Sequence, residues 1–380
     1  MTVQPDRYAK LLDELDRRGR RRRLAPAQGA DFASNDYLGL GRSPELRSAV
    51  QAALDRGVPV GAGASRLLRG NHPEHEALET EAAAFFGVPR SLYFSSGFLA
   101  NYALWSLLPD RADLVVHDSL IHSSCREGMR AGGAMFLEAA HNDPQAFDET
   151  IRHWRSGGGK GRPWISVESL YSMDGDCAPL KELLEVADRH DAMLVVDEAH
   201  ATGVFGRNGR GLADTLAGRD DVIVLHTCGK AMGAQGALVC ASASVIDFLI
   251  NRSRPFIYST APSPLVAASV REALRLIQHD DARRERLHAS MKLANELVRQ
   301  RCGLETPGTQ IIPVIVGDSG RAMALAQALQ SQGYDVRGIR PPTVPEGTAR
   351  LRISITLNVD EPTIRGMIDA LAEASQALPA

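Results

Sequence analysis

Short, almost continuous hydrophobic runs alternate with segments of helical periodicity over most of the chain. Such runs predict strands buried on both faces, since a strand with one wet face would alternate polar and apolar positions. Helices between them would cover a mainly parallel sheet, which predicts an α/β architecture. The predicted strands span 90–96, 113–118, 162–169, 193–199 and 222–227, and the predicted helices include 44–57, 75–87 and 180–191.

The pattern changes near residue 262. Beyond it lie a long helical stretch at 263–301, a hydrophobic run at 311–317, a helix at 321–333 and strand-like segments at 334–339 and 350–356. This order predicts a smaller α+β domain at 263–380. It would follow a large domain at 44–262 and an N-terminal helix and entry segment at 1–43.

The entry segment contains one unusual charge run. Residues 5–24 predict a polar helix that ends in four consecutive arginines, Arg20–Arg23. A solvated helix face is the ordinary interpretation of that run. An arginine turned inward to bind a carboxylate is the alternative.

The composition is that of an ordinary globular protein. The chain has 380 residues, 44% hydrophobic and 23% charged, which favours two domains. Lys and Arg number 43 against 46 Asp and Glu, so a nucleic acid is a poor candidate partner. We expect no signal peptide, because residues 1–10 have no apolar core or cleavage pattern, and no membrane helix, because no apolar stretch reaches the required length. The five cysteines are irregularly spaced. We therefore expect a cytoplasmic protein with neither a disulfide framework nor a metal site.

Two predicted strands are followed directly by residues with distinctive chemistry. Asp197 ends the run that begins at residue 193, and Lys230 follows the run at 222–227. Ligands bind outside the carboxyl ends of strands in open α/β sheets, and about one strand–helix–strand unit separates the two residues. We therefore expect both on one rim of the sheet, where a desolvated lysine is nucleophilic toward aldehydes. Singly, a turn aspartate and a solvent-exposed lysine remain as alternatives.

Other strand ends carry groups that suit a planar, anionic ligand. Gly97 and Phe98 open a predicted helix, whose first amides would bind an anion, although an ordinary serine-capped helix has the same pattern. His122 and Ser172 follow two further strands, where a structural histidine and a tight turn are the alternatives. Combined with a lysine and a carboxylate, these are the groups that pyridoxal phosphate requires.

Longer motifs support this hypothesis. VVDEAHATGVFGRNGRG at 195–211, followed by HTCGKAMGAQGA at 226–237, resembles the α-oxoamine synthases. These are fold-type I (aspartate-aminotransferase-like) pyridoxal-phosphate enzymes that join an amino acid to an acyl thioester with loss of carbon dioxide. The resemblance therefore implies a mainly parallel, seven-stranded type of sheet. SNDYLGL at 34–40, HND at 141–143, YSMDGD at 171–176 and IRPPTVPEGTARLR at 339–352 are similar to the biotin-pathway branch.

The resemblance implies a role for each matching residue. The catalytic residues would be Lys230, which forms the Schiff base, Asp197, which pairs with the pyridine nitrogen, and His122, which stacks on the ring. The other cofactor contacts would come from Gly97, Phe98 and Thr227 at the phosphate, Ser172 and His200 near the ring hydroxyl, and Thr260 at a partner's phosphate. The substrate contacts would come from Arg352 at the amino-acid carboxylate, Arg21 and Thr343 along the acyl chain, Asn35 at the entrance, and His122.

The implied reaction condenses L-alanine with pimeloyl-coenzyme A or pimeloyl-acyl carrier protein, in a homodimer with shared active sites. A sister enzyme that uses glycine, serine or a longer acyl chain is the nearest alternative, although the wording at 339–345 argues against it. An aminotransferase and a catalytically silent subunit of the same fold are two others. The presence of Lys230, Asp197 and His200 disfavours the silent subunit.

Overall fold

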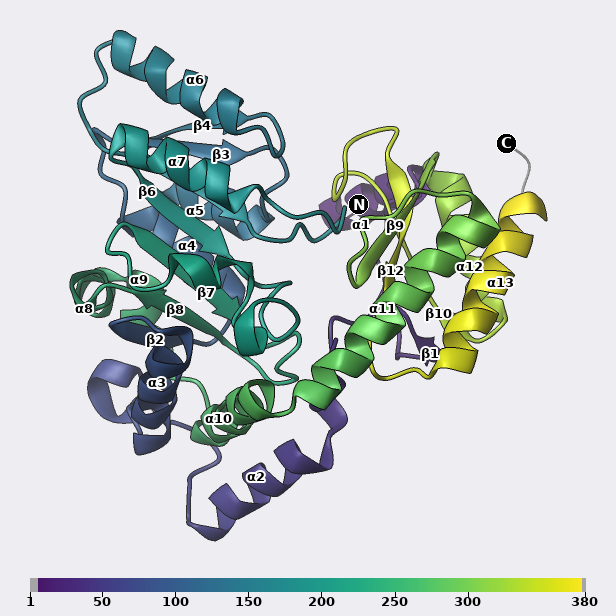
Figure 1. Ribbon diagram of the computed structural model, residues 1–380, viewed down its shortest axis with the longest axis horizontal. Coiled ribbons are helices and arrows are strands. Elements are labelled where there is room, and N and C mark those ends of the chain that lie inside the picture. Colours follow the sequence, from purple (N-terminus) through teal and green to yellow (C-terminus); the bar gives the residue numbers. More distant parts are fainter. Residues whose placement is uncertain (1–5, 378–380) are drawn as a thin grey trace, which may run out of the picture. The chain divides into compact units, whose positions relative to one another are not determined.

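The computed structural model describes residues 6–377, which form two compact units (Figure 1). The larger unit contains residues 35–289 and 356–358, and the smaller contains the other described residues. The boundaries of these two units differ from those of the predicted domains at both places. Residues 263–289 join the larger unit because α10 (Pro264–His279) packs against α2 (Pro44–Asp55) and α3 (Pro73–Phe86). Residues before 35 join the smaller unit because β1 (Ala30–Asp31) pairs with β10 (Tyr334–Asp335).

A seven-stranded sheet forms the centre of the larger unit, with strand order β2-β8-β7-β6-β5-β3-β4. Only β8 runs antiparallel to its neighbours, so the predicted, mainly parallel α/β sheet is confirmed. The strands are β2 (Arg90–Phe94), β3 (Leu114–Asp118), β4 (Met135–Ala139), β5 (Pro163–Glu168), β6 (Met193–Asp197), β7 (Val222–Thr227) and β8 (Ala237–Ala241).

Helices cover this sheet in layers (Figure 1). Met193 and Val195 of β6 pack with residues of α4 (Gly97–Leu107) and α5 (Ser123–Ala131) in one hydrophobic cluster. Asp197 continues the same alternation along β6, so its side chain turns toward α4. In a second group, α6 (Pro144–Ser156) packs against β3 and β4, and α7 (Leu180–His190) packs against β5 and β6.

The remaining helices complete the larger unit and lead out of it. The predicted helical stretch at 263–301 is two helices, because α10 ends at His279 and α11 begins at Asp281, with Asp280 between them. The others are α8 (Ala243–Arg252), the short α9 (Arg254–Ile257) and α11 (Asp281–Cys302), which runs on into the smaller unit.

The smaller unit has the predicted mixed α and β composition. Its three-stranded antiparallel sheet has the order β11-β12-β9. Helices α12 (Ser319–Ser331) and α13 (Glu361–Ala377) pack against each other, and α12 also contacts all three strands. The strands are β9 (Ile311–Gly317), β11 (Arg337–Ile339) and β12 (Ala349–Ser354).

The prediction of one helix over 5–24 is wrong at its C-terminal end, while residue 5 lies outside the described residues. Helix α1 (Arg7–Arg17) stops because Gly19 adopts a left-handed conformation with φ of 62°. The arginine run is therefore not a helix face. Arg20 pairs with Glu346 at 2.5 Å, and Arg22 donates a hydrogen bond to the Thr343 hydroxyl at 3.2 Å, so the run is joined to the segment before β12.

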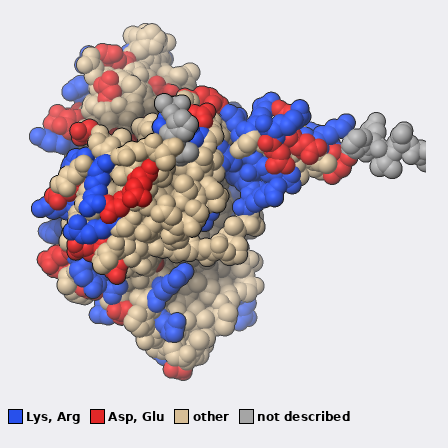
Figure 2. Space-filling model, turned by 90° about the vertical axis from the view of Figure 1, so that its right-hand side faces the viewer, with Lys and Arg blue, Asp and Glu red and all other residues tan. Residues whose placement is uncertain are grey.

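Charges of both signs are interspersed on the face drawn in Figure 2, in keeping with the near balance of 43 basic and 46 acidic residues. None of the helices within residues 6–377 combines the length and apolarity needed to cross a membrane.

Candidate active site

The loop between β7 and β8 holds Lys230 at the carboxyl edge of the sheet. Its backbone is closed by hydrogen bonds from the Gly233 amide to the Lys230 carbonyl at 2.8 Å and from the Ala234 amide to the Cys228 carbonyl at 3.0 Å. Gly233 has φ of 62°, and a Cβ there would lie 2.3 Å from the Gly41 nitrogen. Only glycine allows this approach, so the loop that presents Lys230 is fixed by backbone contacts.

Lys230 lies at one end of a chain of polar contacts. Its Nζ is 2.7 Å from His200 Nε2, and His200 Nδ1 is 2.6 Å from the Tyr37 hydroxyl. The Tyr37 hydroxyl also donates to Asn35 Oδ1 at 3.1 Å. With that hydrogen directed to Asn35, His200 Nδ1–H donates to the Tyr37 oxygen, which leaves Nε2 as an acceptor for the lysine. His200 thereby fixes the position of the amine and can take one of its protons.

Asp197 is held by two donors. Its Oδ1 accepts from the Ala199 amide at 2.9 Å, and its Oδ2 accepts from Asn101 Nδ2 at 2.8 Å. Asn101 lies on α4 and is 3% exposed, and it also donates to Ser124 Oγ at 3.0 Å. This second contact fixes the orientation of the carboxamide. These bonds fix the orientation of the Asp197 carboxylate at the carboxyl edge of the sheet.

His122 caps the N-terminus of α5 through its own ring. Its Nδ1 accepts from the Ser124 amide at 3.2 Å and lies 2.7 Å from Ser124 Oγ. Loss of solvent around the ring, with the positive charge of Lys230, lowers the pKa of His122 against the opposing effect of Asp197. The imidazole is thus neutral at neutral pH, with Nδ1 occupied as an acceptor and the hydrogen on Nε2. Ser124 and Asn101 connect this ring to Asp197.

The start of α4 and the end of β7 form a cradle for an anion. A Cβ on Gly97 would lie 3.0 Å from Thr227 Oγ1, so the glycine brings the helix terminus close to that hydroxyl. Ser96 caps the helix by accepting from the Leu99 amide at 3.2 Å, and the first amides of a helix have no acceptor within it. Two backbone amides, at Gly97 and Phe98, and one hydroxyl suit a phosphate group.

Glu168 is a buried carboxyl beside Asp197 that the sequence did not single out. It is paired in register with Asp197 across β5 and β6, is 2% exposed, and its Oε1 has no hydrogen-bond partner among the described residues. Burial, and then the charge of Asp197, raise the pKa of Glu168 to about 8. At neutral pH Glu168 is therefore largely a neutral acid.

The raised pKa of Glu168 predicts a pH-dependent stability. An unfolded chain loses this proton near pH 4.5 and the folded protein near 8, so the folded state binds more protons between them and stability falls as pH rises through that window. Glutamine cannot ionise. We expect Glu168→Gln to raise the Tm of the cofactor-free protein at pH 8 by roughly 5 °C and to change it little at pH 5. Calorimetry at several pH values checks this, and an equal shift at both pH values would contradict it.

The remaining predicted site residues are distributed over both units. Ser172 lies in the turn after β5, and Thr260 is exposed in the segment between α9 and α10, so the predicted contact of Thr260 stays a prediction about a second copy. Arg21, Thr343 and Arg352 belong to the smaller unit. There Arg352 is buried and donates to Ser354 Oγ at 2.7 Å, and Thr343 bonds Arg22 rather than Arg21.

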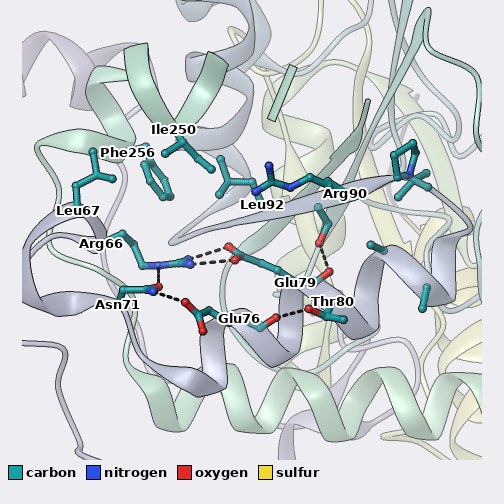
Figure 3. A pocket seen from close by; sticks show the side chains of 15 residues that line it. Arg66, Leu67, Asn71, Glu76, Glu79, Thr80, Arg90, Leu92, Ile250 and Phe256 are labelled. Atoms are coloured by element: carbon teal, nitrogen blue, oxygen red, sulfur yellow. Dashed lines mark hydrogen bonds and ion pairs between the residues drawn. The ribbon is translucent and has the colours of Figure 1, made fainter. Parts of the chain in front are cut away.

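A hollow elsewhere on the larger unit is separate from this rim (Figure 3). It is lined in part by Arg66, whose guanidinium bonds both carboxylate oxygens of Glu79 at 2.8 and 2.9 Å. Glu79 also accepts from the Tyr93 amide at 2.9 Å. The ion pair thus anchors the glycine-rich segment before α3 to the start of the sheet, and none of the predicted site residues lines the hollow.

A lysine and an aspartate at adjacent strand ends, with a neutral imidazole and a phosphate cradle on the same rim, define the class of protein. It is a pyridoxal-phosphate-dependent enzyme of fold type I, and the residues present fit that cofactor. Residues 27–371 match the family described as aminotransferase class I and II. The 8-amino-7-oxononanoate synthase of Anaeromyxobacter dehalogenans strain 2CP-1 is 40% identical over 97% of this chain and 95% of its own length. That of Geobacter sulfurreducens is 40% identical over 91% and 89%.

Solved structures agree with these relatives. A serine palmitoyltransferase from Sphingomonas wittichii has a TM-score of 0.85 at 29% identity, covering 92% of this chain and 88% of its own. The 8-amino-7-oxononanoate synthase of Francisella tularensis has a TM-score of 0.78 at 27% identity, covering 92% and 98%. The chain therefore belongs to the aminotransferase class I and II family, in the branch of the 8-amino-7-oxononanoate synthases. The predicted fold class and the predicted cofactor are confirmed.

Proposed function

We propose that the enzyme condenses L-alanine with a pimeloyl thioester, carried on coenzyme A or acyl carrier protein. The products would be 8-amino-7-oxononanoate, carbon dioxide and the free thiol, in a step of biotin biosynthesis. The observation that carries the proposal is the placement of Lys230, His200 and Asp197 at one carboxyl edge, in a chain 40% identical to synthases of that name. The alternatives with glycine, serine or a longer acyl chain use the same edge and differ in the substrate contacts.

Pyridoxal phosphate supplies an electron sink for the bond changes at the amino-acid α-carbon. Lys230 binds the cofactor in the resting enzyme, and its amine, once released, takes the α-proton of L-alanine. His200 Nε2, 2.7 Å from Nζ, accepts a proton from the amine and so keeps it basic. Asp197 keeps the pyridine nitrogen protonated by the attraction between opposite charges.

The other predicted residues have binding and orienting roles in this proposal. His122 would hold the cofactor ring from one face, and its Nε2–H would donate to the thioester oxygen, where negative charge develops. Arg352 pairs with the carboxylate of L-alanine, since a guanidinium matches a carboxylate in two parallel bonds. The phosphate contacts are Gly97, Phe98 and Thr227, the contacts near the ring hydroxyl are Ser172 and His200, and the acyl and entrance contacts are Arg21, Thr343 and Asn35.

The proposal includes a homodimer in the cytoplasm. Thr260 is exposed on its own chain, which leaves its hydroxyl accessible to the phosphate bound by a second copy. The described cysteines, Cys125, Cys177, Cys228, Cys240 and Cys302, form no disulfide with one another, which suits a reducing compartment. Sedimentation of the holoenzyme tests the dimer directly.

An amino-acid panel tests the proposed substrate. We expect the visible absorbance of the holoenzyme to respond to L-alanine at lower concentration than to glycine or L-serine, and thiol to be released from pimeloyl-coenzyme A only with L-alanine. Pimeloyl-acyl carrier protein in a parallel assay decides between the two carriers. Thiol release with glycine or L-serine alone would assign the enzyme to a sister branch.

A further inference from the structure

A charged cluster beside the rim has no role in the proposed reaction. His141 Nδ1 is 2.8 Å from Asp118 Oδ1, and His141 Nε2 is 2.7 Å from Asp176 Oδ2. Each ring nitrogen must carry a hydrogen to bond a carboxylate, so the ring is an imidazolium between two anions. Although burial opposes the charge, the hydrogen bonds that the ring donates to Asp118 and Asp176 raise the pKa of His141 to about 10. We call His141, Asp118 and Asp176 the histidine clamp.

Asn142 bonds the same two carboxylates as His141. Its amide donates to Asp118 Oδ2 at 2.8 Å, and its Nδ2 donates to Asp176 Oδ2 at 2.7 Å. Asn142 has φ of 53°, a conformation that asparagine adopts more readily than most residues. The backbone is therefore bent at this point so that two successive residues bond the same two carboxylates.

The two carboxylates belong to different loops of the rim. Asp118 ends β3, is fully buried, and accepts from the Leu120 amide at 2.8 Å, at the start of the segment that leads to His122. Asp176 closes the turn after β5, because its carbonyl accepts from the Tyr171 amide at 2.9 Å. Ser172 lies inside that turn. The clamp thus ties the loop of His122 to the turn of Ser172.

Tyr171 adds packing to the charged contacts. Its ring meets the His141 ring edge-on, with centroids 4.5 Å apart and an interplanar angle of 86°. The Gly175 amide donates to the Tyr171 carbonyl at 2.9 Å, which closes the turn from its other side. His141 comes from the loop after β4, so its contacts attach the turn at 171–176 to a second loop of the rim.

We propose that His141 is a positioning residue for the active site, which holds the turn of Ser172 against the end of β3. The inference rests on the proposed role of Ser172 at the cofactor. The clamp brings three loops together, after β3, β4 and β5, and two of them present a predicted cofactor contact. Contacts with a cofactor are strong only when the contacting groups are held in place. A shift of about 1 Å in such a group weakens binding.

A double-mutant cycle on cofactor binding tests the proposal. The proteins are wild type, His141→Gln, Ser172→Ala and the double variant, and the readout is the dissociation constant of pyridoxal phosphate from absorbance titration of the cofactor-free protein. We expect His141→Gln and Ser172→Ala each to weaken binding about tenfold, and the double variant to be no weaker than the worse single one. Multiplied effects, or unchanged binding in His141→Gln, would overturn the proposal.

His190→Gln is the matched control. His190 Nε2 bonds Asp148 Oδ1 at 2.8 Å, the same kind of contact, but it ends α7 at the opposite edge of the sheet from Asp197. We expect it to leave cofactor binding unchanged. If His141→Gln fails to fold, Asp176→Asn replaces it in the cycle with the same criterion. The cycle measures cofactor binding and not turnover. A wild-type protein that binds the cofactor but does not use L-alanine would therefore refute the proposed function, while the cycle would still test the role of His141.

Discussion

Lys230→Ala is expected to lose at least about 10⁴-fold in turnover and to remain folded. The variant removes both the attachment of the cofactor and the proposed base at the α-carbon. It removes little else, because Lys230 is partly exposed and the loop around it is closed by backbone bonds at Gly233 and Ala234. The measurements are thiol release from pimeloyl-coenzyme A with L-alanine, visible absorbance after incubation with pyridoxal phosphate, and Tm.

Lys181→Ala is the control for this prediction, since Lys181 is an exposed lysine on α7. It should match wild type in all three measurements. A Lys230→Ala protein that turns over at even a tenth of the wild-type rate would remove Lys230 from the chemistry. A variant that keeps the absorbance of a lysine-bound cofactor would show that another lysine carries it.

The parallel part of the sheet was predictable because its strands are buried on both faces. Runs such as those of β3 and β6 have no polar positions until their last residues, and few other structures bury such a run. β4 and β8 were not singled out. β8 reads as Ala-Leu-Val-Cys-Ala after a glycine-rich loop, and β4 is an edge strand with Met135, Phe136 and Leu137 exposed, so neither has the strong pattern of a central strand.

Part of the candidate site could be found because position along the chain encodes it. A residue that directly follows a parallel strand lies on the carboxyl rim, which placed Asp197, Lys230, Gly97 and His122 without a structure. The helix predicted over the arginine run was wrong, because Gly19 ends it and the bonds of Arg20 and Arg22 to the segment before β12 are long-range contacts.

The supporting residues could not be found in the same way. Asn101 is 96 positions from Asp197, and Tyr37 is 163 positions from His200. Asn101 lies in α4 and Tyr37 in the turn before residue 40, and neither directly follows a strand of the central sheet. Glu168 reads as the last residue of a strand, and only the register of β5 with β6 places it beside Asp197. A polar residue inside a hydrophobic helical segment, as Asn101 is, was the one available signal, since such residues need a buried partner.

Asp197→Asn is expected to reduce kcat by about 10³-fold with little change in fold. In wild type, the Asp197 carboxylate accepts from the Ala199 amide at 2.9 Å and from Asn101 Nδ2 at 2.8 Å. The amide oxygen of the variant can still accept one of these two bonds, so most of the local geometry survives. The lost feature is the negative charge. An uncharged partner does not keep a pyridine nitrogen protonated, and an unprotonated ring is a poor electron sink.

The same variant has a second, independent signature. The charge of Asp197 is one of the causes, after burial, that hold the pKa of Glu168 near 8, so its removal should move that pKa toward 4.5. The loss of stability with rising pH should then be complete at lower pH than in wild type. Asp148→Asn is the control, because Asp148 is also buried and bonds His190 at 2.8 Å away from the rim; it should lower Tm and leave kcat unchanged. An Asp197→Asn enzyme with the kcat of wild type would show that the ring nitrogen does not depend on this carboxylate.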